Sequence, residues 1–245
     1  MKVIILAAGQ GKRMSPLTNK VPKPLLSFGE DSIIVRIIRQ IVERFNGEVV
    51  VVVGHESDKV TWAVKSVFGN RVSIINNYNY QNDINILSLS LALDEDMEQF
   101  IVFESDCIFD EKAMDKIFDE KIKPSSAWFT IGSFAPAQVG GIVKSNNSHV
   151  EDLLVVSKYE PKFNDYSKLI GVLKVGPNEA ENYVRFLKEE ANADINQYYL
   201  MPWIKNLSIL PCIAVSLKGC STGAFNTPDE YYSVLHNFEK SIYVQ

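Results

Sequence analysis

The stretch that decides the fold is residues 1–26, MKVIILAAGQGKRMSPLTNKVPKPLL. It opens with an apolar run, Val3 to Leu6, which predicts a buried β-strand, and a turn of small residues containing Gly9 and Gly11 follows at once. Glycine lets the backbone approach an anionic ligand closely, and successive N–H groups of such a turn can point inward at it. The segment therefore predicts a strand that leads into a phosphate-binding loop.

Basic side chains follow the turn. Lys12 and Arg13 come directly after the second glycine, and a Pro-Lys-Pro sequence centred on Lys23 closes the loop. Arg13 offers a planar fork that matches phosphate oxygens, whereas Lys23 offers a mobile point charge. This combination is typical of a site that binds a nucleoside triphosphate.

Two other phosphate-binding motifs are excluded because their sequence patterns do not match. A Walker A loop requires Gly-x-x-x-x-Gly-Lys-Ser/Thr, but Lys12 is followed by Arg13 and Met14. A dinucleotide fingerprint requires Gly-x-Gly-x-x-Gly, and its third glycine would fall on Met14. The short Gly-x-Gly pattern is also compatible with an ordinary tight turn after a strand, so a longer pattern is needed to decide.

The longer pattern is Leu-Ala-Ala-Gly-x-Gly-x-Arg-Met from Leu6, followed by Pro-Lys-Pro-Leu from Pro22. It resembles the signature of the nucleotidyltransferases that activate sugar phosphates and related small phosphates. The resemblance implies a Rossmann-like α/β fold, a mostly parallel sheet flanked by helices. It also implies that the loop binds the nucleotide through Leu6, Ala7, Ala8, Gly9, Gly11, Lys12 and Arg13.

The composition is that of a soluble enzyme. At 245 residues the chain is long enough for one large α/β domain, and its 46% hydrophobic and 22% charged residues are ordinary. A net charge of −5 gives no attraction to nucleic acid or anionic membranes, and no apolar run approaches the ~18 residues of a membrane span. With no secretory signal at the N-terminus, we expect a cytoplasmic protein that has neither nucleic acid nor membrane as a partner.

Strand and helix patterns alternate through the first half of the chain. Continuous β-branched runs with intervening amphipathic helices are typical of a parallel sheet covered on both faces. The strands are expected at Val3–Leu6, Glu48–Val53, Val72–Ile75 and Phe100–Phe103, and the helices near Ile33–Phe45, Asp58–Phe68 and Ile84–Leu93.

Beyond residue 124 the pattern changes to shorter, alternating strands, which predict antiparallel strands that cover the acceptor site. We expect a single domain, 1–245, with a nucleotide-binding half of about 1–124 and an acceptor-binding half of about 125–245. The expected strands are Ala127–Gly132, Gly141–Lys144, His149–Val156, Leu169–Val175 and Ile213–Leu217, and the expected helices are Asn178–Glu190, Asn196–Asn206 and one that starts at Pro228.

Ligands of open α/β sheets bind beyond the carboxyl ends of the strands, which selects Asp106 as a metal ligand. Asp106 follows the strand that ends near Glu104, and hard carboxylate oxygens suit Mg²⁺, the ion that offsets repulsion between two phosphates. The alternative is that Asp106 merely starts a turn; in the resembled family a strand-end aspartate coordinates the metal. Cys107 beside it is interpreted as a small buried residue rather than a nucleophile.

The segment 76–89, NNYNYQNDINILSL, is rich in amides and aromatic rings. Amides both donate and accept hydrogen bonds, as reading a pyrimidine edge requires, but an asparagine-rich loop that caps the following helix is the alternative. The spacing resembles the choline-phosphate cytidylyltransferase subgroup, where this region holds the base. The residues concerned are Asn77, Tyr80, Asn85, Ser88 and Leu89, and Gly54 joins them as a strand-end residue on the nucleotide side.

The resemblance implies a reaction in which an acceptor phosphate attacks the α-phosphorus of a triphosphate, with CTP preferred. The product is a CDP-linked small molecule for surface-polysaccharide or lipid-headgroup assembly, and pyrophosphate leaves. Arg13 and Lys23 are the expected catalytic residues, with Mg²⁺ as cofactor, and they act by in-line positioning and charge neutralisation. A sugar-1-phosphate nucleotidyltransferase that uses UTP, dTTP or CTP is the alternative enzyme.

The sequence departs from the family near its C-terminus. Family members carry an acidic residue shortly before the last helix, but the corresponding positions here hold Ala224 and Asn226. Asn226 can still offer a neutral oxygen as a weaker second metal ligand, and Thr227 with Glu230 predicts a helix N-cap. A nucleotide-binding relative with impaired catalysis is therefore a third hypothesis.

The acceptor pocket is expected from the resemblance to involve Lys23, Ser105, Lys158, Gly171 and Tyr198. Phosphocholine, phosphoethanolamine, a phosphonate and an amide phosphate remain open as acceptors. A quaternary ammonium calls for an aromatic cage or a carboxylate. Such a cage could come from Tyr198, Tyr199 and Trp203, with Asp194 or Glu160 nearby, although packing in the core is the alternative for these rings. Dimers are common among such enzymes, so a homodimer is admitted while the oligomeric state stays open.

Overall fold

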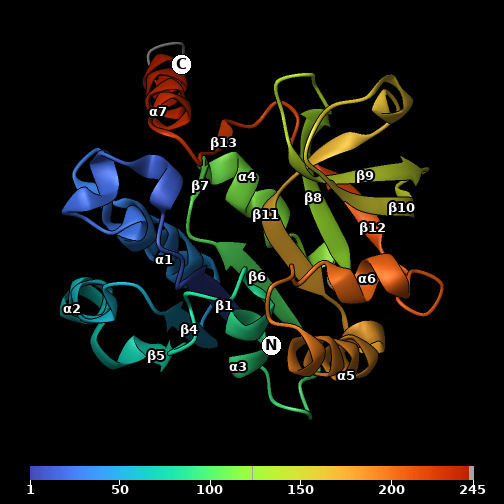
Figure 1. Cartoon of the computed structure of the whole chain (residues 1–245), viewed down its shortest axis with the longest axis horizontal. Coiled ribbons are helices and arrows are strands. Elements are labelled where there is room, and N and C mark those ends of the chain that lie inside the picture. Colours follow the sequence, from blue (N-terminus) through green and yellow to red (C-terminus); the bar gives the residue numbers. More distant parts are fainter. Residues whose placement is uncertain (123, 243–245) are drawn as a thin grey trace.

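The computed structural model describes residues 1–122 and 124–242. Over these residues nine strands form one continuous sheet through the centre of the molecule, in the order β5-β4-β1-β6-β11-β8-β12-β10-β9 (Figure 1). Its strands are β1 (Lys2–Ala7), β4 (Glu48–Val53), β5 (Val72–Asn76), β6 (Phe100–Glu104), β8 (Ala127–Ser133), β9 (Gly140–Asn146), β10 (His149–Val156), β11 (Ser167–Val175) and β12 (Ile213–Ser216). Two short ribbons pair β2 (Ser27–Phe28) with β3 (Asp31–Ser32) and β7 (Cys107–Phe109) with β13 (Thr222–Ala224).

The first half of the sheet is parallel, as the sequence predicts. β1 lies between β4 and β6 and pairs in parallel with both, and β4 pairs in parallel with β5. In register, Val3 lies beside Val49 on one side and Ile101 on the other. Such runs of β-branched residues belong to strands that are buried on both faces.

Helices cover both faces of the sheet, and successive residues of β1 point to opposite layers. Val3 and Ile5 pack in the core with α1, α2, α4 and α7, whereas Ile4 and Leu6 pack with α3, α5 and α6. None of the helices in the described residues is long and apolar enough to span a membrane. The helices are α1 (Ile33–Arg44), α2 (Ser57–Phe68), α3 (Ile86–Leu91), α4 (Glu111–Ile117), α5 (Pro177–Ala193), α6 (Met201–Lys205) and α7 (Pro228–Ile242).

The second half extends the same sheet instead of folding over it. β11 pairs antiparallel with β6, with Val172 beside Phe103, and this pairing joins the two halves. β9 and β10 form an antiparallel hairpin, whereas β8 and β12 are parallel, because the chain passes through α5 and α6 before β12 is reached. The expected antiparallel strands are thus present, with one parallel pair among them.

Two local expectations differ from the structure. The helix expected over Asn196–Asn206 is reduced to α6, because Pro202 is tolerated only in the first helical turn and the helix begins at Met201. β7 and β13 were not expected at all. Each is three residues long, and each is extended because it pairs with a segment far away in sequence, with Ala224 beside Cys107.

Candidate functional site

A cavity of about 880 Å³ opens where β1 and β6 end. Its lining draws on the loop after β1, the segment before α3, the end of β6, strands β8 to β11, and the segment that precedes α6. Fifteen of the residues expected at the site lie in this lining: Leu6, Ala8, Gly9, Gly11, Lys12, Arg13, Lys23, Tyr80, Asn85, Ser88, Ser105, Asp106, Gly171, Tyr198 and Asn226. Ala7, Gly54, Asn77 and Lys158 lie outside it.

The loop after β1 has a shape that requires glycine. Gly11 has φ +62°, and a Cβ there would lie 3.0 Å from the Lys23 Cβ and 3.3 Å from a methyl of Thr18. The Thr18 hydroxyl donates to the carbonyl of Gly11 at 3.0 Å, and Met14 is buried below the loop. Around Gly9 a Cβ would meet nothing within 4 Å, so this side of the loop is open to a ligand.

Four side chains at the loop form what we term the phosphate cluster: Arg13, Lys23, Asp106 and Asn226. The Lys23 ammonium donates to Asp106 Oδ2 at 2.7 Å and to Asn226 Oδ1 at 3.3 Å. The Arg13 guanidinium donates to the same Asn226 oxygen at 2.8 Å. Two cations are thus held side by side by one carboxylate and one amide oxygen.

Pairing between β7 and β13 brings Asn226 to Asp106. The N–H of Phe225 donates to the carbonyl of Asp106 at 3.3 Å. A capping box then fixes the chain: the Glu230 carboxylate accepts from the N–H of Asn226, and the Thr227 hydroxyl accepts from the N–H of Glu230. The N-cap predicted at Thr227 is confirmed, and it holds Asn226 in the phosphate cluster.

Glu104 lies on the cavity floor in a setting that penalises its charge. Burial and the carboxylate of Asp106 raise the pKa of Glu104 to about 7, although a hydrogen bond from the Tyr199 hydroxyl and the charges of Lys168 and Lys23 oppose the rise. Gly171 on β11 leaves the room for this side chain, because a Cβ there would lie 2.5 Å from a Glu104 carboxylate oxygen. Gly171 therefore contributes to the site through its missing side chain.

The donor set at this edge suits a hard divalent cation. Ligand atoms of Glu104, Asp106 and Cys107 lie within 4.8 Å of one another, but burial raises the pKa of the Cys107 thiol well above its ordinary value, so it stays protonated. Oxygen atoms of Asp106 and Asn226 both contact the same ammonium, so a single cation already spans them. Carboxylate and amide oxygens are the ligands that Mg²⁺ prefers, and the residues fit that ion.

The amide-rich segment before α3 is an internal network. Both N–H groups of the Asn77 amide are used, toward Asp83 Oδ2 at 2.8 Å and the Ser88 hydroxyl at 2.9 Å. Asp83 accepts in turn from the N–H groups of Leu87 and Ser88, which caps α3. Asn77 is buried and thereby supports the cap, while Tyr80, Asn85 and Ser88 reach the cavity. An aspartate three residues before the first helical residue was the signal for this cap.

Gly54 lets two strand-end loops touch. A Cβ at Gly54 would lie 2.6 Å from the Tyr80 Cβ and 2.9 Å from the carbonyl oxygen of Ala8. The N–H of His55 donates to that same carbonyl at 3.0 Å. Gly54 is therefore required for the close approach of the Tyr80 loop to the loop after β1, without itself reaching the cavity.

The aromatic rings on the acceptor side divide between cavity and core. Tyr198 is 39% exposed and Tyr199 is buried, and both line the cavity, whereas Trp203 is buried outside its lining. Trp128, which the sequence did not single out, stacks on Tyr199 at 6.0 Å and meets Trp203 edge-on at 5.9 Å. The Trp203 indole N–H donates to the carbonyl of Leu210. Of the three rings considered for a cage, Trp203 thus lies apart from the cavity that Tyr198 and Tyr199 line.

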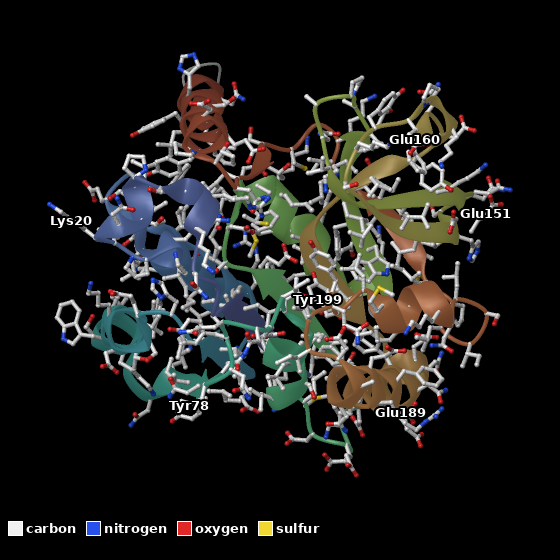
Figure 2. The ribbon with its side chains drawn as sticks, viewed as in Figure 1. Lys20, Tyr78, Glu151, Glu160, Glu189 and Tyr199 are labelled. Carbon is white, nitrogen blue, oxygen red and sulfur yellow. The ribbon has the colours of Figure 1, made fainter. Side chains whose placement is uncertain are left out.

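The carboxylates considered for that cage also lie elsewhere. Figure 2 shows Tyr199 near the centre of the molecule and Glu160 out beside the β9 and β10 hairpin. Glu160 pairs with Lys162 at 2.9 Å, and Lys158 is exposed, 3.9 Å from the same carboxylate. Asp194 caps a turn by accepting from the N–H of Asn196.

Lys168 is a cavity residue that the sequence analysis missed. Its ammonium donates to the carbonyls of Leu169 at 2.9 Å and Gly141 at 3.2 Å, and it lines the cavity close to Glu104. Burial lowers the pKa of Lys168, and the carboxylate of Glu104 opposes that change. A lysine directly before the apolar run 169–173 of β11 was the available signal.

Comparison with known proteins adds a family and a fold. The family model described as nucleotidyl transferase matches residues 2–161. The chain is 24% identical to the choline-phosphate cytidylyltransferase of Streptococcus pneumoniae, over 94% of this chain and 95% of that protein. It is 25% identical to the bifunctional protein GlmU of Methanococcus aeolicus, but it spans only 57% of that protein's length.

A solved structure of the CTP:phosphocholine cytidylyltransferase from Streptococcus pneumoniae has the same fold. It superposes with a TM-score of 0.81 at 22% identity and covers 96% of this chain and 97% of its own. The agreement extends over both halves of the sheet, so the Rossmann-like α/β fold expected from the sequence is confirmed.

Proposed function

The chain belongs to the nucleotidyl transferase family, and from that premise we propose that it is a cytidylyltransferase that joins CTP to a small phosphorylated acceptor and releases pyrophosphate. The phosphate cluster carries the proposal, because Arg13 and Lys23 share the Asn226 oxygen beside Asp106. A reaction between two anionic phosphates requires such a concentration of fixed positive charge. The cytidylyltransferase relative, which matches over nearly its whole length, supports CTP as the nucleotide.

The chemical step is an in-line displacement. An oxygen of the acceptor phosphate attacks the α-phosphorus of CTP, a new P–O bond forms, and the bond to the bridging oxygen of the β-phosphate breaks. Its electron pair leaves with pyrophosphate, and the ionised acceptor phosphate needs no base to activate it. Arg13 and Lys23 hold phosphate oxygens in line and offset the charge that accumulates in the transition state.

Asp106 and Asn226 are the residues that would hold Mg²⁺, with Glu104 as a further carboxylate close by. When bound, Mg²⁺ supplies positive charge that reduces the repulsion between the two phosphates. Because Asn226 is neutral where the family carries an acid, we expect this chain to bind the ion more weakly.

The nucleotide base is assigned to the pocket formed by Tyr80, Asn85 and Ser88. Asn85 also ties this pocket to the acceptor half, because its side-chain oxygen accepts from the N–H of Tyr199 at 2.9 Å. Asn77 supports this pocket indirectly, because it donates to Asp83, which caps α3. The Ser88 hydroxyl is used in the same network, since it donates to Asp83 Oδ2 at 2.6 Å, so the base region has a rigid backbone with Tyr80 and Asn85 as its groups toward the cavity.

The proposal is tested by pyrophosphate release with Mg²⁺, in which CTP, UTP, dTTP, ATP and GTP are each combined with pooled acceptors. The pools are sugar 1-phosphates, phosphorylated amino alcohols, phosphonates, and small hydroxylated or amide phosphates. We expect release with CTP and a non-sugar pool. Release only with the sugar pool would replace the proposal by a sugar-1-phosphate nucleotidyltransferase. CTP binding without release in any pool would identify a nucleotide-binding protein with impaired catalysis.

A further inference from the structure

The ammonium of Lys168 is held by the backbone with one N–H left over. Its two hydrogen bonds go to the carbonyls of Leu169 and Gly141, and an ammonium has three N–H groups. Both acceptors are neutral, so the positive charge is not cancelled by its own hydrogen bonds. Gly140 and Gly141 have no side chains to cover it, and a Cβ at Gly140 would lie 3.5 Å from the Lys168 nitrogen. The remaining N–H can therefore meet a ligand in the cavity.

The carboxylates of the cavity already have partners. Among the described residues the lining holds three, Asp83, Glu104 and Asp106. Asp83 caps α3 and binds Asn77, and Asp106 binds Lys23. Glu104 accepts a hydrogen bond from Tyr199 and interacts with both Lys23 and Lys168. A ligand that carries a fixed positive charge would find each of these carboxylates in use.

The rings that could hold such a charge are also committed. Tyr199 stacks on Trp128, and Trp203 packs edge-on against the same indole, all three being buried. A quaternary ammonium binds across the faces of rings that surround it. Of the aromatic side chains that line the cavity, Tyr198 is exposed and Tyr80 is half-buried, but Tyr80 is assigned to the base pocket. The cavity also contains the ammonium of Lys168, which repels a second cation.

We propose that Lys168 determines acceptor specificity: its remaining N–H donates to an oxygen in the non-phosphate part of the acceptor, so the enzyme prefers phosphorylated compounds that carry a hydroxyl, carbonyl or carboxylate there and discriminates against quaternary ammonium compounds. This inference rests on the proposed function. The acceptor phosphate is assigned to the phosphate cluster, and Glu104 is close enough to interact with both Lys23 of that cluster and Lys168. The acceptor thus extends from Lys23 past Glu104 to Lys168.

Four phosphates that share a two-carbon linker and differ only in the group at its far end test the proposal: phosphocholine, its neutral isostere 3,3-dimethylbutyl phosphate, 2-hydroxyethyl phosphate and 3-phosphonooxypropionate. Binding is measured by calorimetry with Mg²⁺ and a non-hydrolysable CTP analogue, and kcat/KM by pyrophosphate release with CTP. For the wild type we expect at least one oxygen-bearing acceptor to exceed phosphocholine about tenfold or more in affinity and in kcat/KM. This factor is the scale of one hydrogen bond to a charged group. Comparison of the hydroxyl-bearing with the carboxylate-bearing acceptor shows which kind of oxygen Lys168 prefers.

In Lys168→Met we expect the oxygen-bearing members to lose about 10- to 100-fold in affinity, while the neutral isostere changes by less than about threefold. Lys168→Gln, which keeps an N–H donor, should retain part of the preference and serves if the methionine variant does not fold. Lys144→Met is the matched control, because Lys144 lies outside the cavity, 3.9 Å from Asp165, and it should leave every value unchanged.

Three results would overturn the inference. The first is a wild-type protein that prefers phosphocholine over its neutral isostere. The second is an equal loss for all four acceptors in Lys168→Met with CTP binding intact, since that would place the acceptor phosphate itself on Lys168. The third is binding of none of the oxygen-bearing members. Absence of pyrophosphate release would instead contradict the proposed function, and the calorimetric comparison would still decide the role of Lys168.

Discussion

At the scale of single residues, the site depends on which oxygen meets which cation. Lys23 donates to both Asp106 and Asn226, and Arg13 donates to the same Asn226 oxygen. The two cations therefore face one carboxylate and one neutral amide, which supply one negative charge fewer than two carboxylates would. This balance leaves more net positive charge for incoming phosphates and less attraction for a metal ion. The two effects can be separated by substitution.

Asp106→Ala should lower kcat by about 10²- to 10³-fold, because it removes both the partner of Lys23 and the proposed ligand for Mg²⁺. The measurement is steady-state pyrophosphate release at saturating CTP. Asp96→Asn, at an exposed carboxylate outside the cavity, is the control and should match the wild type. Near-normal turnover in a folded Asp106→Ala protein would contradict the metal assignment.

Asn226→Asp should tighten Mg²⁺, lowering the half-saturating concentration on the order of tenfold, because it restores a charge at an oxygen that already contacts a cation. The check is a Mg²⁺ titration of pyrophosphate release, together with metal binding measured by calorimetry without nucleotide. An unchanged Mg²⁺ dependence in both assays would contradict the assignment of position 226 to the metal site.

At the scale of elements, loops after different strands are fixed by caps rather than by extensive packing. The capping box of α7 positions Asn226, and Asp83 caps α3 while it binds Asn77 and Ser88. Both caps lie within a few residues of the cavity. Binding geometry is therefore coupled to the local stability of helix ends.

Asp83→Ala should destabilise the protein by about 0.5–2 kcal/mol, because it removes the cap of α3 and leaves the buried Asn77 amide without one acceptor. It should also raise the KM for CTP, since the proposed base pocket lies on the capped segment. Urea unfolding measures the first effect and initial rates the second. Asn82→Ala at the neighbouring exposed position is the control, and equal unfolding midpoints for the two variants would contradict the role of Asp83.

At the scale of the whole molecule, one sheet runs through both halves of the described chain, and the paired strands β6 and β11 both contribute residues to the cavity lining. Glu104 at the end of β6 fits beside Gly171 of β11 and interacts with lysines from the first strand's loop and from β11. The pairing of β6 with β11 thus also buries the Glu104 carboxylate, and burial destabilises its charged form.

Stability should report that cost. The pKa of Glu104 is raised from 4.5 to about 7, so the folded state binds its proton more tightly than the unfolded state does. Its contribution favours folding below about pH 4.5 and is lost as the pH rises to about 7. In EDTA, the unfolding free energy of Glu104→Gln minus that of the wild type should therefore rise over this range and level off above it. A difference independent of pH would contradict the shifted pKa.

Sequence by itself determined the features that depend on neighbouring residues. The run Val3 to Leu6 followed by glycines specifies a buried strand and its loop, and Thr227 with Glu230 specifies a helix start, because strand periodicity and caps act over a few residues. Repeated β-branched runs between amphipathic helices were enough to predict the parallel half of the sheet.

Only the tertiary structure decided which distant residues meet. Lys23 and Asn226 lie 203 positions apart and are joined by the pairing of two three-residue strands, which carry too little local pattern to be recognised. Lys168 lies in the cavity because β11 pairs with β6. Trp203 lies outside it because its indole N–H donates to a carbonyl in the core. Strand pairing and burial over long separations set these outcomes, since their free energy arises only when the sheet is assembled.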